Sequence, residues 1–209
     1  MPTRIFLLSP ARLDGARARL LFNPDAAFPL ARALGAREGA ALSDVFSFLS
    51  GLYFRGKHAY AQKFGRPSAR VAAVHIITTT RGLLPPETRV TRCELEAFAE
   101  VDLSAADHRF HAPLLRDASR IRAALDDAAE VVLLGSIATG KYVDTLLDVF
   151  GERLVFPQAF VGRGDMSRGG LLLRQARAGE ELDYVPIAGA VLHGARPPKL
   201  PPLAYRPRS

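Results

Sequence analysis

The chain has 209 residues, a hydrophobic fraction of 48% and one cysteine. This size suits one medium domain with a substantial core, and the lone Cys93 excludes an internal disulfide and a cysteine-based zinc cluster. His108 and His111 have the spacing of metal ligands, but no further cluster accompanies them, so we expect no metal. No apolar run approaches the ~18 residues of a membrane span, and the apolar start is too short for a signal peptide. We therefore expect a cytoplasmic protein without membrane contact. The sequence does not determine its oligomeric state.

The formal net charge of +7 invites comparison with nucleic-acid-binding proteins, because clustered Lys and Arg displace counterions from phosphates. The distribution of the charge weakens that comparison. Residues 195–209 hold four Lys and Arg and no acid, so residues 1–194 carry only +3. We predict a single α/β domain over residues 1–194, followed by a Pro-rich basic tail over 195–209 that cannot continue a helix or a sheet.

Short β-branched or apolar runs alternate along the chain with stretches that repeat apolar residues at helical spacing. In chain order these patterns predict a strand over Arg4–Leu8, a helical region from Ser43 as N-cap to Phe64 with a break at Gly51 or Gly56, a strand over Val71–Thr79, a helix over Leu114–Ala129, a strand over Val131–Leu134, a helix over Tyr142–Phe150, a strand over Arg153–Phe156, a helix over Gly170–Ala178 and a strand over Asp183–Ile187. Alternating strands and helices predict an α/β fold, specifically a Rossmann-like three-layer sandwich with a mostly parallel central sheet of about five strands.

The ends of the predicted strands are rich in glycine, arginine and small hydroxyl residues. In parallel sheets ligands bind outside the carboxyl ends of the strands, so one anion- or nucleoside-binding crevice would account for these residues together. The predicted ligand-binding residues are Ser9, Arg12, Thr80, Arg81, Gly82, Gly135, Ser136, Lys141, Tyr142, Arg163, Ser167 and Arg168.

Gly135–Lys141 reads G-x-x-x-x-G-K after a strand, which is the beginning of a nucleoside-triphosphate P-loop. The following helix would offer free N–H groups, and Lys141 adds a positive charge. However, Tyr142 stands where that motif needs Ser or Thr for magnesium, and the neighbouring strands end without an Asp. The loop therefore favours binding of an anion or nucleoside, with a plain strand–helix turn as the structural alternative and Mg-NTP hydrolysis as the least favoured interpretation. We expect no cofactor.

Phe160–Gly170 is a second glycine-rich segment, and Asp165 is its only acid. Among arginines, this carboxylate could orient a ribose hydroxyl, act as a base, or stabilise a cationic sugar during glycosidic cleavage. We therefore predict Asp165 as the catalytic residue. The structural alternative is a flexible loop in which Asp165 pairs with Arg163 or Arg168 and Ser167 caps the next helix.

Tyr53, Lys57, Tyr60 and Phe64 share one face of the predicted helix that precedes the second strand. Interleaved aromatic and basic side chains can stack bases and contact phosphates. The more common arrangement is a core face of aromatic rings whose lysine stem reaches to water.

With these segments in view, the chain resembles the uncharacterised α/β proteins related to the YaaA peroxide-stress family. Leu7–Asp14 is similar to that family's opening strand with its S-P-A-K-T-L-D sequence, although Arg12 replaces the Lys and Leu13 the Thr. Leu52-Tyr53 with Ala59–Ala61 is similar to its L-Y…Y-A helix, and Thr78–Pro86 to its S-A-K-Y-G-L-L-P-P loop. Such relatives are associated with DNA binding, oxidative-stress protection and modified-base metabolism. The resemblance therefore implies a nucleic-acid or nucleobase context, without settled catalytic residues.

Together these observations predict a protein that binds a nucleotide, a nucleoside or a nucleic-acid end in one crevice. Whether it is an enzyme stays open; if it is, a nucleoside or nucleobase glycosidase or transferase that uses Asp165 fits best. One alternative is a non-enzymatic DNA- or RNA-binding stress-response protein that uses the Tyr53–Phe64 face and the tail 195–209. A less favoured alternative is a P-loop-like nucleotide hydrolase built on Gly135–Lys141.

Overall fold

The main sheet has six strands in the order β4-β3-β1-β6-β7-β8 in a computed structural model, which describes residues 2–103, 106–137, 140–190, 194–195, 197–198 and 200. Neighbouring strands from β3 to β7 are parallel, while β4 and β8 add antiparallel edges. The strands are β1 (Arg4–Leu8), β3 (Val74–Ile77), β4 (Leu83–Leu84), β6 (Glu130–Leu134), β7 (Leu154–Pro157) and β8 (Tyr184–Pro186).

The central strands β1 and β6 are apolar because helices cover both faces of the sheet. Every side chain in Ile5–Leu8 and Val131–Leu134 is fully buried. Parallel strands that are buried on both faces have continuous apolar sequences, and this pattern allowed both strands to be predicted. Leu8 pairs with Leu134 on one side and with Ile76 on the other, so the carboxyl ends of these strands are nearly level.

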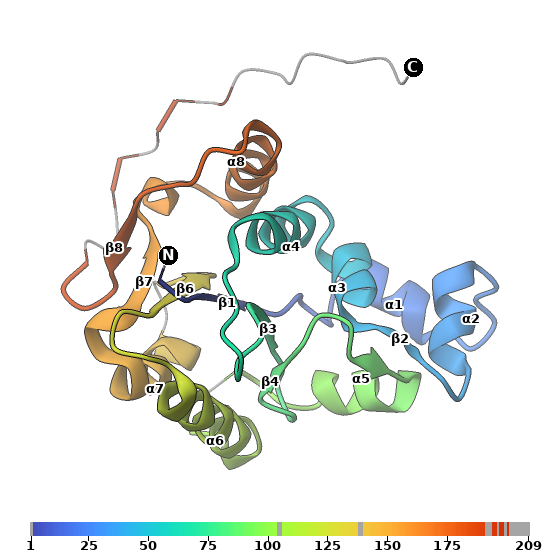
Figure 1. The fold of residues 1–209 in the computed structure, drawn as a ribbon. Coiled ribbons are helices and arrows are strands. Elements are labelled where there is room, and N and C mark those ends of the chain that lie inside the picture. The colour runs from blue at the N-terminus through green and yellow to red at the C-terminus, as the bar shows by residue number, and fades with distance from the viewer. Residues whose placement is uncertain are drawn as a thin grey trace.

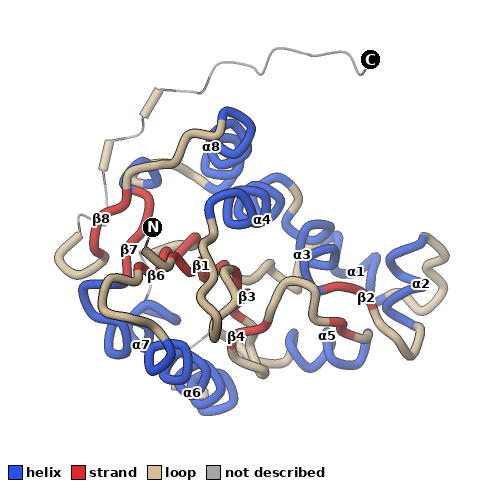
Figure 2. The backbone as a smooth tube through the Cα atoms, in the orientation of Figure 1, coloured by secondary structure: helices blue, strands red, loops and turns tan. Residues whose placement is uncertain are grey.

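Helices α4 and α8 lie over one face of the sheet, and α6 and α7 lie over the opposite face (Figure 1). Figure 2 shows the strands running between these two groups of helices. The remaining helices gather beyond β4, around a small antiparallel ribbon of β2 (Ala40–Ala41) and β5 (Arg89–Val90). The helices are α1 (Ala16–Phe22), α2 (Pro29–Gly35), α3 (Leu42–Ser50), α4 (Leu52–Phe64), α5 (Arg92–Ala99), α6 (His108–Ala124), α7 (Gly140–Phe150) and α8 (Asp165–Ala178).

The predicted α/β class and mostly parallel sheet are confirmed, with six strands in place of about five. The additional strand is β4, which turns back onto β3 through Gly82 at a φ of 69°. Strand β3 is shorter than the predicted Val71–Thr79, because the Ser68 hydroxyl accepts hydrogen bonds from the Arg70 and Val71 N–H groups and holds that segment in a turn. None of the described helices has the length and apolar character that crossing a membrane requires.

Helix boundaries differ from the prediction at their starts. Ser43 does not cap α3, which begins at Leu42 without a side-chain cap, whereas the predicted break at Gly51 is present with a φ of 59°. Helix α6 begins at His108 rather than Leu114, because the Asp107 carboxylate accepts a hydrogen bond from the backbone N–H of Arg109.

Helix α5 was not predicted, although Thr91 and Glu94 form a complete capping box at its start. Helix α8 begins at Asp165, so the second half of the predicted glycine-rich loop, Asp165–Gly170, is helical and Ser167 is not the cap. Most of the predicted tail, including Arg206 and Arg208, lies outside the described residues.

Among the described residues, α4 and α8 form the most extensive helix–helix contact, and two glycines permit it. A Cβ atom at Gly56 would lie 2.5 Å from the carbonyl oxygen of Gly169, and one at Gly169 would lie 2.7 Å from the carbonyl oxygen of Leu52. The backbones therefore touch, which no larger side chain would allow. Gly56 consequently does not break α4; it serves packing.

The Gly169→Ala substitution is expected to lower the free energy of unfolding by about 1–3 kcal/mol, because the added methyl group meets backbone atoms that must move. Gly170 provides a matched control on the same helix, since a Cβ there meets only the Leu200 side chain, at 3.8 Å. Gly170→Ala should be neutral or stabilising by up to about 1 kcal/mol through helix propensity. Urea denaturation measures both variants, and equal effects would contradict the close approach.

Candidate functional site

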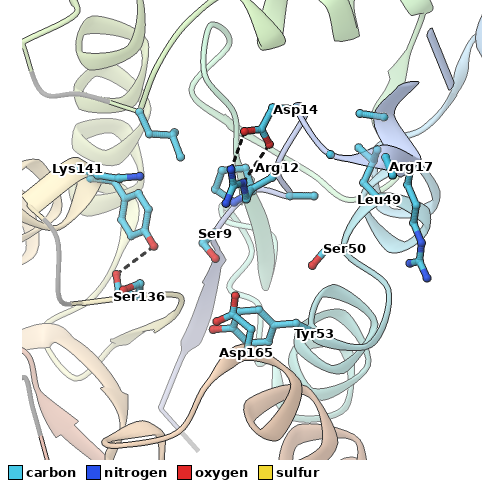
Figure 3. A pocket seen from close by; sticks show the side chains of 17 residues that line it. Ser9, Arg12, Asp14, Arg17, Leu49, Ser50, Tyr53, Ser136, Lys141 and Asp165 are labelled. Carbon is cyan, nitrogen blue, oxygen red and sulfur yellow. Dashed lines mark hydrogen bonds and ion pairs between the residues drawn. The ribbon is translucent and has the colours of Figure 1, made fainter. Parts of the chain in front are cut away.

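A cavity of about 700 Å³ opens at the carboxyl ends of β1 and β6 (Figure 3). The connection from β1 to β3 includes α4 on one face of the sheet, and the connection from β6 to β7 includes α7 on the opposite face (Figure 1). A crevice forms where the connections diverge in this way. Its volume lies within the ~300–1,000 Å³ range of small-molecule sites.

Several predicted residues meet in this crevice although they lie far apart in the sequence. Ser9 and Arg12 follow β1, Lys141 lies in the first turn of α7, and Asp165 begins α8 (Figure 3). The predicted residues that line the crevice are Ser9, Arg12, Ser136, Lys141, Tyr142 and Asp165. Of the two glycine-rich segments, Gly135–Lys141 contributes Ser136 and Lys141 to the lining, and Phe160–Gly170 contributes Asp165.

The side chains of Ser9 and Tyr142 pack directly against the backbone of Gly135. A Cβ atom at Gly135 would lie 2.6 Å from the Tyr142 hydroxyl and 2.9 Å from the Ser9 Cβ. The Tyr142 hydroxyl donates a hydrogen bond of 3.0 Å to the carbonyl oxygen of Ser136, and burial raises the pKa of Tyr142 to about 12. Tyr142 is therefore uncharged near neutral pH, and its hydrogen bond to Ser136 holds the segment that follows β6 in place. Ala138 and Thr139 of the P-loop-like segment lie outside the described residues.

The rim of the crevice carries charges of both signs. The Arg12 guanidinium donates to the Asp14 carboxylate at 3.0 and 2.6 Å, and this exposed pair lies above Ser9 (Figure 3). Lys141 forms no ion pair within the described part of the chain. Asp165 is largely exposed and lies 3.9 Å from the Arg168 guanidinium. A ligand anion near Lys141 would therefore contact a positive charge that has no carboxylate partner within ion-pair distance among the described residues.

The predicted residues Thr80, Arg81 and Gly82 do not reach the crevice. The chain reverses here into β4, and the Thr78 hydroxyl donates to the carbonyl oxygen of Gly82 at 2.9 Å. Arg81 pairs with Glu94 of α5 at 2.6 Å. This loop looks like a ligand loop in the sequence because glycine and hydroxyl residues also make tight turns.

Arg163, Ser167 and Arg168 stabilise the connection into α8 and do not line the crevice. Arg163 donates to the carbonyl oxygen of Ala159 at 3.0 Å and to the Ser167 hydroxyl at 3.2 Å. Arg168 donates twice to the carbonyl oxygen of Phe160, at 3.2 and 3.3 Å. These arginines hold the start of α8, and with it Asp165, in place.

The aromatic and basic face of α4 is turned into the molecule. Tyr53, Lys57 and Tyr60 are buried, so this face is not available to stack bases. Lys57 does not extend to water either. Its side chain is 1% exposed, and its Nζ donates to the carbonyl oxygen of Ser9 at 2.6 Å and to the Ser9 hydroxyl at 2.8 Å. A lysine on an otherwise aromatic helix face was the available signal for this contact, and sequence reasoning did not use it.

Burial lowers the pKa of Lys57 to about 7, and the negative charge of Asp165 opposes this shift. The Nζ also lies 4.6 Å from the centre of the Tyr53 ring, which offers a partial negative charge. Burial raises the pKa of Tyr53 as well. Near neutral pH the crevice floor therefore holds an amine close to its titration midpoint beside protonated tyrosine hydroxyls.

Comparisons of the chain with protein-family models, curated proteins and solved structures find no match. The resemblance to the YaaA-related proteins therefore stays a prediction. The described residues contain no group of three or more His, Cys, Asp and Glu that could hold a metal ion.

The Lys57→Met substitution is expected to remove a pH dependence from the free energy of unfolding. The unfolded chain keeps the lysine proton up to its ordinary pKa of 10.5, whereas the folded chain releases it near 7. Wild type should thus gain stability relative to Lys57→Met as the pH rises from 7 toward 10, by at most about 1.4 kcal/mol per pH unit.

Urea denaturation between pH 6 and 9 measures this difference. Lys63→Met is the matched control, because Lys63 lies exposed near the end of the same helix. Its stability relative to wild type should not change with pH in this range. A pH-independent difference for Lys57→Met would show that Lys57 does not titrate near neutrality.

Proposed function

We propose that the crevice between β1 and β6 binds a nucleotide- or nucleoside-class ligand. The observation that carries this proposal is the meeting of the β1 end, the α7 start and the α8 start around one cavity of about 700 Å³. Nucleotides bind at this position in doubly wound sheets, and we propose that this sheet is a Rossmann-like arrangement of that kind. The ligand lies across the strand ends, with its polar groups toward the two helix starts.

The anionic part of the ligand lies near Lys141. The first turn of α7 presents backbone N–H groups and the positive end of the helix dipole, and Lys141 adds a full charge there. Leu49 and Leu103 contribute apolar surface elsewhere on the lining, which suits a base or another flat apolar group. Charge at one end and apolar surface at the other match a nucleoside phosphate.

The sugar of the ligand lies toward Asp165, the carboxylate that borders the crevice from α8. A carboxylate beside the anomeric carbon stabilises the positive charge that develops when an N-glycosidic bond breaks. This arrangement supports N-glycosidic cleavage or transfer as the reaction. A DNA- or RNA-binding function through the α4 face has no support, because that face is buried.

A thermal-shift screen of nucleobases, nucleosides, nucleotides and short oligonucleotides tests ligand binding, because a ligand at 100 times its Kd adds about 2.7 kcal/mol to the native state. A nucleoside phosphate should raise the Tm of wild type. Lys141→Ala should weaken its binding roughly 10- to 100-fold through loss of a charge-assisted contact. Lys63→Ala, which removes an exposed lysine away from the crevice, should bind as wild type does. No shift with any compound of the screen contradicts the proposal.

Release of free base from the bound nucleoside, followed by chromatography, tests the reaction. Asp165→Asn keeps the size of the side chain and removes its charge, so turnover should fall roughly 100-fold or more while ligand binding persists. Asp183→Asn, at an exposed position away from the crevice, is the control and should retain full turnover. Normal turnover by a folded Asp165→Asn protein would remove Asp165 from the reaction.

A further inference from the structure

Ser9, Lys57 and Tyr53 meet at the floor of the crevice, and the proposed function gives none of them a reactive role. The Lys57 Nζ lies 2.8 Å from the Ser9 hydroxyl oxygen, within direct proton-transfer distance. Ser9 directly follows the central strand β1 and lines the cavity that a ligand would enter (Figure 3). A hydroxyl group with an amine in contact and an open cavity in front is the arrangement of an activated nucleophile.

Lys57 is suited to accept a proton because it is held away from water. Its side chain is 1% exposed, and the burial that lowers its pKa to about 7 makes the neutral amine abundant near neutral pH. In the neutral amine one N–H still donates to the carbonyl oxygen of Ser9, while the free lone pair accepts the Ser9 hydroxyl proton. The same contacts thus serve both protonation states.

Tyr53 supplies a hydroxyl group without a partner beside this pair. Its hydroxyl oxygen is buried and forms no hydrogen bond with the described residues, although a buried polar group left unpaired costs roughly 1–3 kcal/mol. The side chain lines the same cavity as Ser9 and lies close to Asp165 (Figure 3). A donor of this kind is satisfied when negative charge develops on a bound substrate.

We propose that Ser9 is a nucleophile, that Lys57 is its general base, and that the crevice catalyses acyl transfer from a carboxylic ester to water. The Ser9 oxygen bonds to the carbonyl carbon as its proton passes to neutral Lys57, and Tyr53 donates to the carbonyl oxygen that becomes negative. The bond to the leaving oxygen then breaks, and the Lys57 ammonium returns the proton to that oxygen. Water cleaves the acyl-serine in the same way, which regenerates the Ser9 hydroxyl.

This activity goes beyond the proposed nucleotide binding and does not require it. The proposal requires only a carboxylic ester that fits the crevice, and the reacting atoms contact Ser9 rather than Lys141. The experiments below use phenylmethylsulfonyl fluoride and p-nitrophenyl acetate and no nucleotide, so they succeed or fail independently of the ligand screen.

Covalent labelling of the full chain with phenylmethylsulfonyl fluoride tests the nucleophile. Intact mass should show one sulfonyl group per chain, and peptide mapping should place it on Ser9. Ser9→Ala should not be labelled, whereas Ser119→Ala, which changes an exposed serine of α6, should be labelled as wild type is. A folded wild-type protein that takes no label, or takes it at Ser50 or Ser136 of the crevice wall, overturns the proposal.

The pH dependence of labelling tests the base. The groups around the pair are Asp165 and Arg168 of α8, Tyr142 of α7 and Tyr53, and burial raises the pKa of both tyrosines. The labelling rate should therefore rise with pH through about 7 and then level, because only neutral Lys57 accepts the proton. A rate that rises only above pH 10, as for an ordinary lysine, overturns the assignment.

Lys57→Met should reduce the labelling rate roughly 100-fold or more. If that variant does not fold by circular dichroism, Lys57→Ala with added ethylamine replaces it, since the small amine can occupy the space left by the side chain. Restored labelling supports Lys57 as base, and labelling that is fast without the amine contradicts it. Tyr53→Phe should keep labelling at Ser9 but slow hydrolysis of p-nitrophenyl acetate at least roughly 10-fold, and unchanged hydrolysis removes Tyr53 from the reaction.

Discussion

The backbone contact between α4 and α8 is the constraint on which the crevice depends. Because Gly56 and Gly169 have no side chains, the two helices approach until backbone atoms meet. This approach places the start of α8, with Asp165, beside the end of β1, where Lys57 of α4 is buried against Ser9. A larger residue at either glycine would separate the helices and admit water to the lysine.

The same burial has opposite effects on stability and on chemistry. An ammonium group removed from water is costly, and the hydrogen bonds from Lys57 to Ser9 offset only part of that cost. The unfavourable desolvation is also what lowers the pKa of Lys57 toward neutrality. A fold that retains this lysine beneath an open cavity therefore exchanges stability for an amine that can change its protonation state near neutral pH.

Sequence reasoning located the strands well and the helix starts poorly. β1 and β6 lie within one residue of their predicted bounds, because burial on both faces leaves continuous apolar runs. The start of α8 was predicted too late, since Arg163 and Arg168 secure a glycine-rich segment whose composition resembles a loop. The Thr80–Gly82 turn was assigned to the crevice because turn residues and ligand-loop residues are the same types.

The sequence by itself determined the α/β class and placed Ser9, Ser136 and Lys141 at one edge of the sheet, because hydrophobic periodicity and parallel strand ends follow from local patterns. Only the tertiary structure decided the direction of Lys57. Its partner Ser9 lies 48 residues away, and a lysine at that helical position could equally have reached water. Lys57 is buried in the fold, and its amine turns inward to the carbonyl and hydroxyl oxygens of Ser9.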